Sequence, residues 1–340
     1  MAGFWKVFIN EVLDREGDTI RLLERAGCKV ILGRPMGEYP GYSEAEMIHL
    51  AEEVDALMGA SRDPYAHTVM AKSKRLQVIS KYGIGVEKID LKAANEYGVL
   101  ICNTPIEEDV EAVAEHTITL MLALVKRLKK VEAHLREGGW RDFSIEPQDL
   151  WGQTVGIIGM GRIGKAVAER LQNWGVKLLF YDPFVEMSSL KTKGIEKTTL
   201  DALLRQSDIV SLHVVAKPET YHLLDREKLR VMKLTAYIIN TSRGEVIEEN
   251  ALVEALEGGW IAGAGIDVFE KEPVTPKNPL FSFEQVILTP HAAGWTPRSK
   301  RKISEKAVEN CLSVLKGEIP SFLVNREALP QWRQRFAKGV

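Results

Sequence analysis

The sequence predicts an α/β protein with two doubly wound domains, each built on a parallel sheet. Three observations lead to this prediction. Short apolar runs alternate with helix-period amphipathic segments almost from end to end. These runs fall into two sets along the chain, and 340 residues suit two domains at roughly 150 residues each. A composition with 45% hydrophobic and 27% charged residues is that of an ordinary globular protein.

The first hundred residues contain five strand candidates, which we expect to form a compact flavodoxin-like sheet. The candidates are residues 7–9, 30–32, 56–58, 78–80 and 99–102. Amphipathic segments that can cross over between parallel strands occupy residues 14–26, 43–54, 65–72 and 91–97.

The second set has six strand candidates, which match the size of a full Rossmann dinucleotide-binding domain. They are residues 155–158, 178–181, 209–213, 237–240, 265–268 and 286–288. A long helix predicted over 110–128 precedes them and is apolar on more than one face, so we expect it to be buried between domains or subunits.

The end of the chain predicts a discontinuous first domain. After Pro290 one amphipathic segment remains, residues 299–315, with no strand to build a third sheet. We therefore expect this segment to return to the first domain. The predicted division is a substrate domain of residues 1–103 and 292–330, a nucleotide-binding domain of residues 104–291, and a tail of residues 331–340.

Charge and cysteine content exclude several classes of partner. A net charge of −2 gives no reason to expect a nucleic acid or an anionic membrane. Cys28, Cys102 and Cys311 are far apart and lack metal-site spacing, so we expect reduced thiols and no metal.

We recognise no signal peptide, and the most apolar stretch, residues 118–125, is far shorter than the ~20 residues of a membrane span. We expect a cytoplasmic protein.

A glycine-rich loop is the sharpest local signal. The apolar run 155–158 leads into Gly159-x-Gly161-x-x-Gly164, and a helix pattern follows directly. In such loops the first glycine permits a tight turn, the second lets a pyrophosphate approach the backbone, and the third lets helix and strand pack closely. Arg162 and Ile163 would begin the helix, whose free N–H groups favour phosphate.

An acidic residue at the next strand end indicates which dinucleotide binds. Asp182 lies 18 residues beyond Gly164, at the end of the strand candidate 178–181. A carboxylate there accepts hydrogen bonds from ribose hydroxyls and repels a 2′-phosphate. No Arg or Lys follows in Pro183-Phe184. The pattern favours NAD over NADP, although Asp182 could also be a simple turn residue.

Three further strand ends carry groups that suit the reduction of a 2-keto acid. Arg243 follows the strand 237–240, Glu272 lies shortly after the strand 265–268, and His291 follows the strand 286–288. An Arg can hold a carboxylate at two points, a His can donate or accept a proton, and a neighbouring carboxylate orients that His. Taken singly, each could instead be a salt-bridge, loop or capping residue.

The chain resembles the D-isomer-specific 2-hydroxyacid dehydrogenases over residues 76–324. The resemblance depends on the glycine loop together with six other motifs. These are residues 82–90, residues 103–105 followed by 112–117, residues 207–213, residues 240–244, residues 265–269 and Pro290-His291.

The resemblance implies NAD-dependent hydride transfer at the 2-position of a small 2-hydroxy or 2-keto acid. It implies that Arg243 binds the carboxylate, that His291 is the acid/base and that Glu272 is its charged partner. Members place the active site between the two domains and form dimers through the nucleotide domain. The substrate-binding set it implies is Lys81, Tyr82, Gly83, Ile84, Gly85 and Arg243. The cofactor-binding set is Gly159, Gly161, Arg162, Ile163, Gly164, Asp182, His213, Thr241, Asp267 and His291.

Three alternatives remain open at this point. A nucleotide-sensing corepressor of the same fold could retain these residues, although no basic patch or long disordered tail is evident. Formate oxidation is disfavoured, because relatives that handle formate have an amide where this chain has Glu272. A phosphorylated substrate stays possible, with Arg62 and Lys81 as candidates for its second anionic group.

Overall fold

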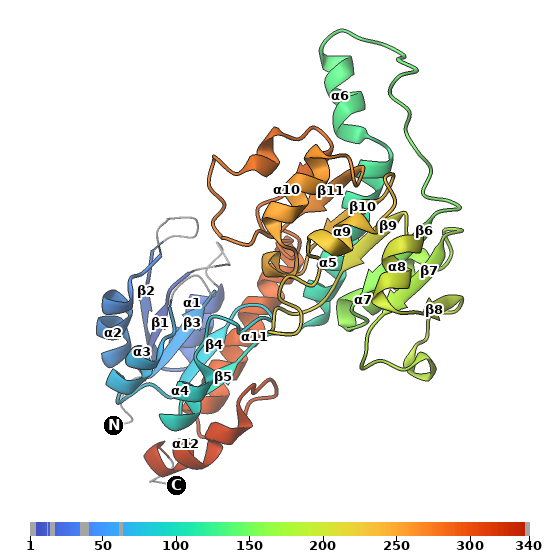
Figure 1. The fold of residues 1–340 in the computed structure, drawn as a ribbon. Coiled ribbons are helices and arrows are strands. Elements are labelled where there is room, and N and C mark those ends of the chain that lie inside the picture. The colour runs from blue at the N-terminus through green and yellow to red at the C-terminus, as the bar shows by residue number, and fades with distance from the viewer. Residues whose placement is uncertain (1–4, 12, 14–17, 35–40, 61–63, 337–340) are drawn as a thin grey trace. The chain divides into compact units, whose positions relative to one another are not determined.

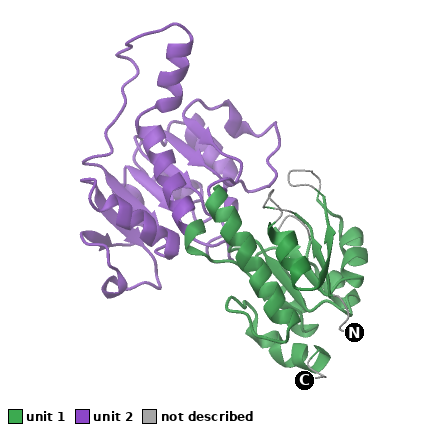
Figure 2. Ribbon diagram, turned by 180° about the vertical axis from the view of Figure 1, so that it is seen from behind, with its two compact units in different colours: residues 1–109, 296–340 green, residues 110–295 purple. Residues whose placement is uncertain are grey.

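The computed structural model describes residues 5–11, 13, 18–34, 41–60 and 64–336. The chain forms two compact units (Figure 2). Unit 1 comprises residues 1–109 and 296–340, and unit 2 comprises residues 110–295. Both boundaries fall a few residues after the divisions predicted from the sequence. Arg62 lies outside the described residues, so its predicted role cannot be placed.

Unit 1 is built on a five-stranded parallel sheet with the order β2-β1-β3-β4-β5 (Figure 1). This is the flavodoxin-like order, in which the chain reverses direction across the sheet between β1 and β3. All five predicted strands are confirmed. Their bounds are β1 Trp5–Ile9, β2 Cys28–Leu32, β3 Ala56–Gly59, β4 Val78–Lys81 and β5 Leu100–Cys102.

Helices cover both faces of this sheet and create two apolar cores. Leu23 of α1 and Cys311 of α11 belong to one core, whereas Met47 of α2 and Val69 of α3 belong to the other. The α11 helix of the C-terminal segment packs on this first sheet, where the hydroxyl of Ser80 donates to the carbonyl of Ala307 at 2.8 Å. The helices are α1 Asp18–Arg25, α2 Glu44–Glu52, α3 His67–Lys72, α4 Leu91–Glu96 and α11 Pro297–Leu315.

The segment predicted as a tail differs from that expectation. After the short 3₁₀ helix η4 (Arg326–Ala328), residues Leu329–Phe336 form the helix α12. Its Trp332 is only 2% exposed and joins the core around α1 and α11. This helix has no clear amphipathic pattern, because a single buried tryptophan anchors it and its other residues are mostly polar.

Unit 2 is built on a seven-stranded parallel sheet with the order β12-β11-β10-β9-β6-β7-β8 (Figure 1). Counted from β6, this is the Rossmann order 3-2-1-4-5-6 with one strand added at the far edge. The six predicted strands are present, and β8 is an additional strand that was not predicted. Only Ile195 of β8 is buried, because β8 is an edge strand of three residues. The bounds are β6 Thr154–Ile158, β7 Lys177–Tyr181, β8 Ile195–Lys197, β9 Ile209–Leu212, β10 Tyr237–Asn240, β11 Gly263–Ile266 and β12 Val286–Leu288.

The helix predicted over 110–128 is present as α5, which ends three residues earlier, and a second helix, α6, follows it. The first, α5, spans Glu107–Val125 and packs on the sheet, where Gly265 of β11 leaves room for Leu120. Arg127 then adopts a left-handed conformation with φ of 46°, which ends the helix, and α6 begins at Leu128 and runs to Arg136. No residue of α6 is buried, and α6 stands away from the sheet (Figure 1).

The remaining helices of unit 2 complete the two faces of its sheet. Helices α8, α9 and α10 contribute to one core, and α5 and α7 contribute to the other. Across the part of the chain that the structure describes, no helix has both the length and the apolar character needed to cross a bilayer. The bounds are α7 Arg162–Leu171, α8 Leu200–Gln206, α9 Arg226–Arg230 and α10 Glu249–Glu257, with the 3₁₀ helices η1 Met187–Ser189, η2 Gly244–Val246 and η3 Pro279–Ser282.

Candidate active site

The glycine loop joins β6 to α7, and each of its glycines meets a different steric demand. Gly159 has φ of +93°, and a Cβ there would lie 2.6 Å from the carbonyl oxygen of His213. A Cβ on Gly164 would lie 2.1 Å from the carbonyl oxygen of Gly159, so loop and helix are in backbone contact. A Cβ on Gly161 would meet nothing within 4 Å. The space beside Gly161, at the N-terminus of α7, is therefore open to a ligand.

Arg162 and Ile163 are the first two residues of α7. The N–H groups of a first helical turn have no partner within the helix and carry its partial positive charge. This end of α7 is therefore suited to an anionic group such as a pyrophosphate.

Asp182, just past β7, is bonded to the backbone on both sides. Its carboxylate accepts from the N–H of Met160 at 2.9 Å and from the N–H of Phe184 at 2.8 Å. It thus ties the glycine loop to the end of β7. Each carboxylate oxygen has a second lone pair, so these contacts leave acceptor capacity for ribose hydroxyls.

His213 follows β9 and lies against the glycine loop. Its Nε2 is 2.8 Å from the hydroxyl of Ser211, and its Nδ1 is buried with no hydrogen-bond partner among the described residues. Burial lowers the pKa of His213 to about 3, because the ring is poorly solvated when charged. The ring is therefore neutral at physiological pH.

The ends of β10, β11 and β12 are aligned. Asn240 pairs with Ile266, and Ile266 pairs with Leu288. Arg243 and His291 each come three residues after this line. Neighbouring strands are about 4.8 Å apart, so β10 and β12 are separated by roughly 10 Å. A guanidinium and an imidazole carried at that separation can reach the two ends of one small molecule.

The loop after β10 carries Arg243 and packs directly on the loop after β11. A Cβ on Gly244 would lie 1.9 Å from the backbone carbon of Phe269, so only glycine fits there. The loop is also braced internally, since Asn240 donates from its amide to the carbonyl of Arg243 at 2.9 Å. The Arg243 guanidinium is partly buried and donates to the carbonyl of Ser242 at 2.6 Å.

His291 and Glu272 form a direct pair. Nδ1 of His291 lies 2.8 Å from Oε2 of Glu272, and the N–H of Phe269 donates to the other oxygen of Glu272 at 3.1 Å. The His291 side chain is 51% exposed and that of Glu272 is 28% exposed. Glu272 is thus held beneath a histidine whose ring faces solvent.

Asp267 organises the turn that carries His291. It is 1% exposed, and its carboxylate accepts from the N–H groups of Ala292 at 2.8 Å and Ala293 at 3.0 Å. Its carbonyl also accepts from the N–H of His291 at 2.7 Å. These bonds hold His291 in the left-handed region, at φ of 52°, which non-glycine residues rarely adopt. The structure therefore gives Asp267 a role in shaping this turn.

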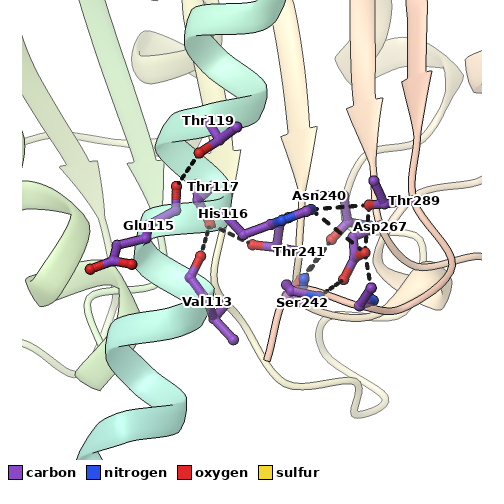
Figure 3. A network of polar contacts seen from close by, with 12 residues as sticks. Val113, Glu115, His116, Thr117, Thr119, Asn240, Thr241, Ser242, Asp267 and Thr289 are labelled. Atoms are coloured by element: carbon purple, nitrogen blue, oxygen red, sulfur yellow. Dashed lines mark hydrogen bonds and ion pairs between the residues drawn. The ribbon is translucent and has the colours of Figure 1, made fainter. Parts of the chain in front are cut away.

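Two neighbouring residues of α5 also contact these loops, and neither was among the predicted site residues. Nε2 of His116 lies 3.1 Å from the hydroxyl of Thr289, and the hydroxyls of Thr117 and Thr241 are 2.8 Å apart (Figure 3). Both residues belong to the 112–117 motif that was used only to support the family resemblance. Nothing in the sequence indicated that they would meet strand ends more than a hundred residues away.

The predicted substrate segment Lys81–Gly85 lies in unit 1 and begins at Lys81, the last residue of β4. Gly83 has φ of +83° and donates to the hydroxyl of Thr104 at 2.7 Å. The side chain of Asn103 donates to the carbonyl of Ile84 at 2.8 Å. The buried Lys81 donates from Nζ to the carbonyl of Tyr82 at 2.7 Å. The segment is a well-braced turn at the carboxyl end of its strand.

The unit 2 residues predicted for catalysis therefore gather at one end of a single sheet. Glu272 and His291 are in contact, Asp267 shapes their turn, and the Arg243 loop packs beside them. Among the residues that the structure describes, no three His, Cys, Asp or Glu side chains converge as metal ligands would.

Comparison with known proteins identifies this architecture. The model of the D-isomer specific 2-hydroxyacid dehydrogenase NAD-binding domain matches residues 118–293. The glyoxylate reductase of Thermofilum pendens is 40% identical over 330 residues, which cover 95% of each chain.

Solved structures of similar proteins extend over both units. D-lactate dehydrogenase from Aquifex aeolicus, complexed with NAD and lactic acid, has a TM-score of 0.83 and 31% identity, covering 94% of this chain and 99% of that one. An NADPH-dependent glyoxylate/hydroxypyruvate reductase from Sinorhizobium meliloti, in complex with NADP and malonate, has a TM-score of 0.81 and 26% identity, covering 96% and 98%. The chain belongs to the D-isomer specific 2-hydroxyacid dehydrogenases, a family of oxidoreductases that work with a nicotinamide cofactor.

Proposed function

We propose that this chain uses NADH to reduce a small 2-keto acid, with glyoxylate as the first candidate, and catalyses the reverse oxidation of the 2-hydroxy acid. The His291–Glu272 pair, held at the same sheet end as Arg243, is the observation that carries this proposal. Relatives that are 36–40% identical support the choice of acid, since several are named glyoxylate reductases.

His291 is proposed as the acid and base. Because the Glu272 carboxylate accepts a hydrogen bond from Nδ1–H of His291, Nε2 is the nitrogen that faces a substrate. When protonated, Nε2 donates to the keto oxygen as hydride reaches C2, and when neutral it accepts the hydroxyl proton in the reverse direction. The Glu272 carboxylate stabilises the imidazolium that the second direction produces. Such proton transfer contributes about 10²–10⁴ in rate.

Arg243 is proposed to hold the substrate carboxylate. Its guanidinium presents planar donors that match the two oxygens of a carboxylate. In unit 1 the proposed substrate segment is Lys81–Gly85. Since the N–H of Gly83 is engaged by Thr104, we propose Ile84 and Gly85 as the backbone donors to an anion.

The residues of the glycine loop fit a nicotinamide dinucleotide, which supplies the hydride when bound. The open space beside Gly161 would receive the pyrophosphate, and the carboxylate of Asp182 would bind the adenosine ribose. We propose that Asp182 selects NAD over NADP by repelling the 2′-phosphate. His213 and Thr241 are proposed to line the cofactor, and Asp267 to hold the nicotinamide carboxamide.

We propose a homodimer that forms through unit 2. Helix α6 and the segment after it expose an apolar surface that no other described element covers, with Trp140 77% and Phe143 89% exposed. Val131, Leu135, Trp140 and Phe143 line a hollow of about 370 Å³ there. Exposed apolar side chains that lie together on one surface are typical of a subunit interface. We propose that the same surface of a second copy of this chain covers it.

We also propose the cytoplasm as its compartment. Cys28, Cys102 and Cys311 are all free and buried in unit 1. Three unpaired thiols are typical of proteins that work in a reducing compartment. Fractionation of cells that express the tagged chain would test this location, and the proposal predicts the chain in the cytoplasmic fraction.

A panel of 2-keto acids tests the reaction. NADH oxidation is followed with glyoxylate, hydroxypyruvate, pyruvate, 3-phosphohydroxypyruvate and a branched 2-keto acid. The proposal predicts turnover with at least one small unphosphorylated acid, and the highest kcat/KM with glyoxylate. Binding of NADH without turnover of any acid would instead favour a nucleotide-sensing protein.

A further inference from the structure

One turn of α5 holds both loops that carry the proposed catalytic residues. His116 and Thr117 are adjacent on this helix and extend to two different strand ends (Figure 3). His116 reaches Thr289, just after β12 and two residues before His291. Thr117 reaches Thr241, just after β10 and two residues before Arg243.

Hydrogen-bond directions in the His116 branch follow from the chemistry of its acceptors. The Asp267 carboxylate accepts, so the single hydroxyl proton of Thr289 goes to Asp267 at 2.5 Å. The oxygen of Thr289 must then accept from Nε2–H of His116 at 3.1 Å. His116 therefore carries its proton on Nε2 and anchors the chain His116–Thr289–Asp267, which ends on the N–H groups of Ala292 and Ala293.

The Thr117 branch has an equally definite direction. A carbonyl can only accept, so the hydroxyl proton of Thr117 goes to the carbonyl of Val113 at 2.7 Å. Thr117 then accepts from the hydroxyl of Thr241 at 2.8 Å. Thr117 is fully buried, so the loss of this acceptor would leave the Thr241 hydroxyl without its partner in the protein interior.

We infer that His116 and Thr117 are positioning residues that act separately on the two loops. His116 sets the turn of His291 through Thr289 and Asp267, and Thr117 sets the loop of Arg243 through Thr241. This inference rests on the roles proposed above for His291 and Arg243. It makes α5 a shared support that fixes the proton donor and the carboxylate-binding group relative to one another.

Loss of the His116 contact and loss of the Thr117 contact should change different kinetic constants. Loss of one neutral hydrogen bond that positions a group is worth roughly a 3- to 10-fold change. His116→Phe keeps the ring shape without the donor, and should lower kcat by that factor with little change in the KM for glyoxylate. Thr117→Val keeps the shape without the hydroxyl, and should raise the KM for glyoxylate by that factor with little change in kcat.

Conservative variants and a matched control accompany these changes. His116→Gln places an amide donor where Nε2 was, and Thr117→Ser restores the hydroxyl, so both should recover most of the lost function. Thr119→Val is the control, because Thr119 is exposed on the same helix and donates only back to the carbonyl of Glu115 at 2.9 Å. It should leave kcat and KM unchanged.

Amide hydrogen exchange on the full chain, without ligand, provides a readout that does not depend on activity. His116→Phe should speed exchange in residues 289–294 and leave residues 241–246 unchanged. Thr117→Val should show the opposite selectivity, and Thr119→Val should alter neither segment. If Thr117→Val does not fold, Thr241→Val removes the same bond from its other side. If His116→Phe does not fold, Thr289→Val removes the bond from His116 together with the bond that Thr289 donates to Asp267.

These readouts distinguish the inference from the proposed function. Absence of turnover in the wild-type chain would refute the proposed reaction, and the exchange pattern would still decide whether α5 holds the two loops. Equal acceleration of both segments by either variant would overturn the inference, as would exchange rates that match the wild type. In an active enzyme, proportionate losses in kcat and KM from both variants would overturn it as well.

Discussion

Nδ1 of His291 lies 2.8 Å from Oε2 of Glu272, and this contact leaves Nε2 as the nitrogen directed to the exposed side of the ring. The pair requires β11 and β12 to end side by side, because Glu272 follows one strand and His291 follows the other. It also requires the turn that Asp267 holds.

Removal of the imidazole should abolish most turnover without loss of cofactor. His291→Ala is expected to lower kcat by about 10²-fold or more, because no other group delivers the proton as hydride arrives. NADH affinity, measured by fluorescence titration, should stay near the wild-type value. His222→Ala is the control, since it removes another imidazole–carboxylate pair, His222–Glu270 at 2.7 Å, and should retain most activity. Near-normal turnover in His291→Ala would remove His291 from its role.

Arg243→Lys tests two-point binding of the carboxylate. Lysine keeps the positive charge but presents it as a single point, so it cannot reproduce the planar pair of donors. The KM for the 2-keto acid should rise by at least about tenfold, a loss of roughly 1.4 kcal/mol, with a smaller change in kcat. Steady-state kinetics with saturating NADH measures both. An unchanged KM would place carboxylate binding elsewhere.

Asp182→Ala should narrow the preference for NADH over NADPH. The variant removes the charge that repels a 2′-phosphate, and it also removes the acceptor for the N–H of Met160. A general loosening of the glycine loop would weaken both cofactors alike, so the ratio of their kcat/KM values isolates the charge. Glu186→Ala, which removes an exposed carboxylate nearby, should leave this ratio unchanged. The same ratio in Asp182→Ala and wild type would contradict the assignment.

His213 should make folding sensitive to acid. Burial lowers its pKa to about 3, below the ordinary value of 6.5, so the unfolded chain binds the proton more readily. The neutral His213 ring contributes fully to the free energy of unfolding above about pH 6.5. This contribution is lost as the pH falls from 6.5 toward the folded-state pKa of about 3. The loss is at most about 1.4 kcal/mol per pH unit. Urea unfolding at pH 7 and pH 5 should show a smaller difference for His213→Gln than for the wild type. Equal differences would rule out this coupling.

The exposed apolar surface of α6 and the segment after it should be needed for dimer formation. Phe143→Glu places a charge on the apolar hollow, and we expect it to convert the dimer to monomers in sedimentation velocity runs. Phe184→Glu is a matched control, because Phe184 is 83% exposed in unit 2 but lies outside that hollow. A wild-type chain that sediments as a monomer would refute the dimer, and a dimeric Phe143→Glu would place its interface elsewhere.

A strand could be predicted from the sequence wherever most of its residues are apolar and buried. The eleven predicted strands are all present, because each is an apolar run with turn residues at both ends. By contrast, β8 has one buried residue and α12 depends on Trp332, so neither gave a periodic signal. The end of α5 at Val125 and the separate helix α6 were not predicted, because the left-handed turn at Arg127 between them has no glycine to mark it.

The candidate site could be predicted only as a set of residue types at strand ends. Parallel strands bring their carboxyl ends to one edge, so the grouping of Arg243, Glu272 and His291 followed from the topology. The support from His116 and Thr117 could not be predicted, since it depends on the angle and rotation at which α5 packs on the sheet. The second role of Asp267, as acceptor for the turn of His291, likewise depends on local backbone geometry.

The most direct test of the central claim is a crystal structure of the chain with NAD and a 2-hydroxy acid bound. We predict that the guanidinium of Arg243 contacts both carboxylate oxygens of the acid. Nε2 of His291 should lie within hydrogen-bond distance of the 2-hydroxyl, with Glu272 still on Nδ1. An acid bound with its carboxylate away from Arg243 and its hydroxyl away from His291 would contradict the account.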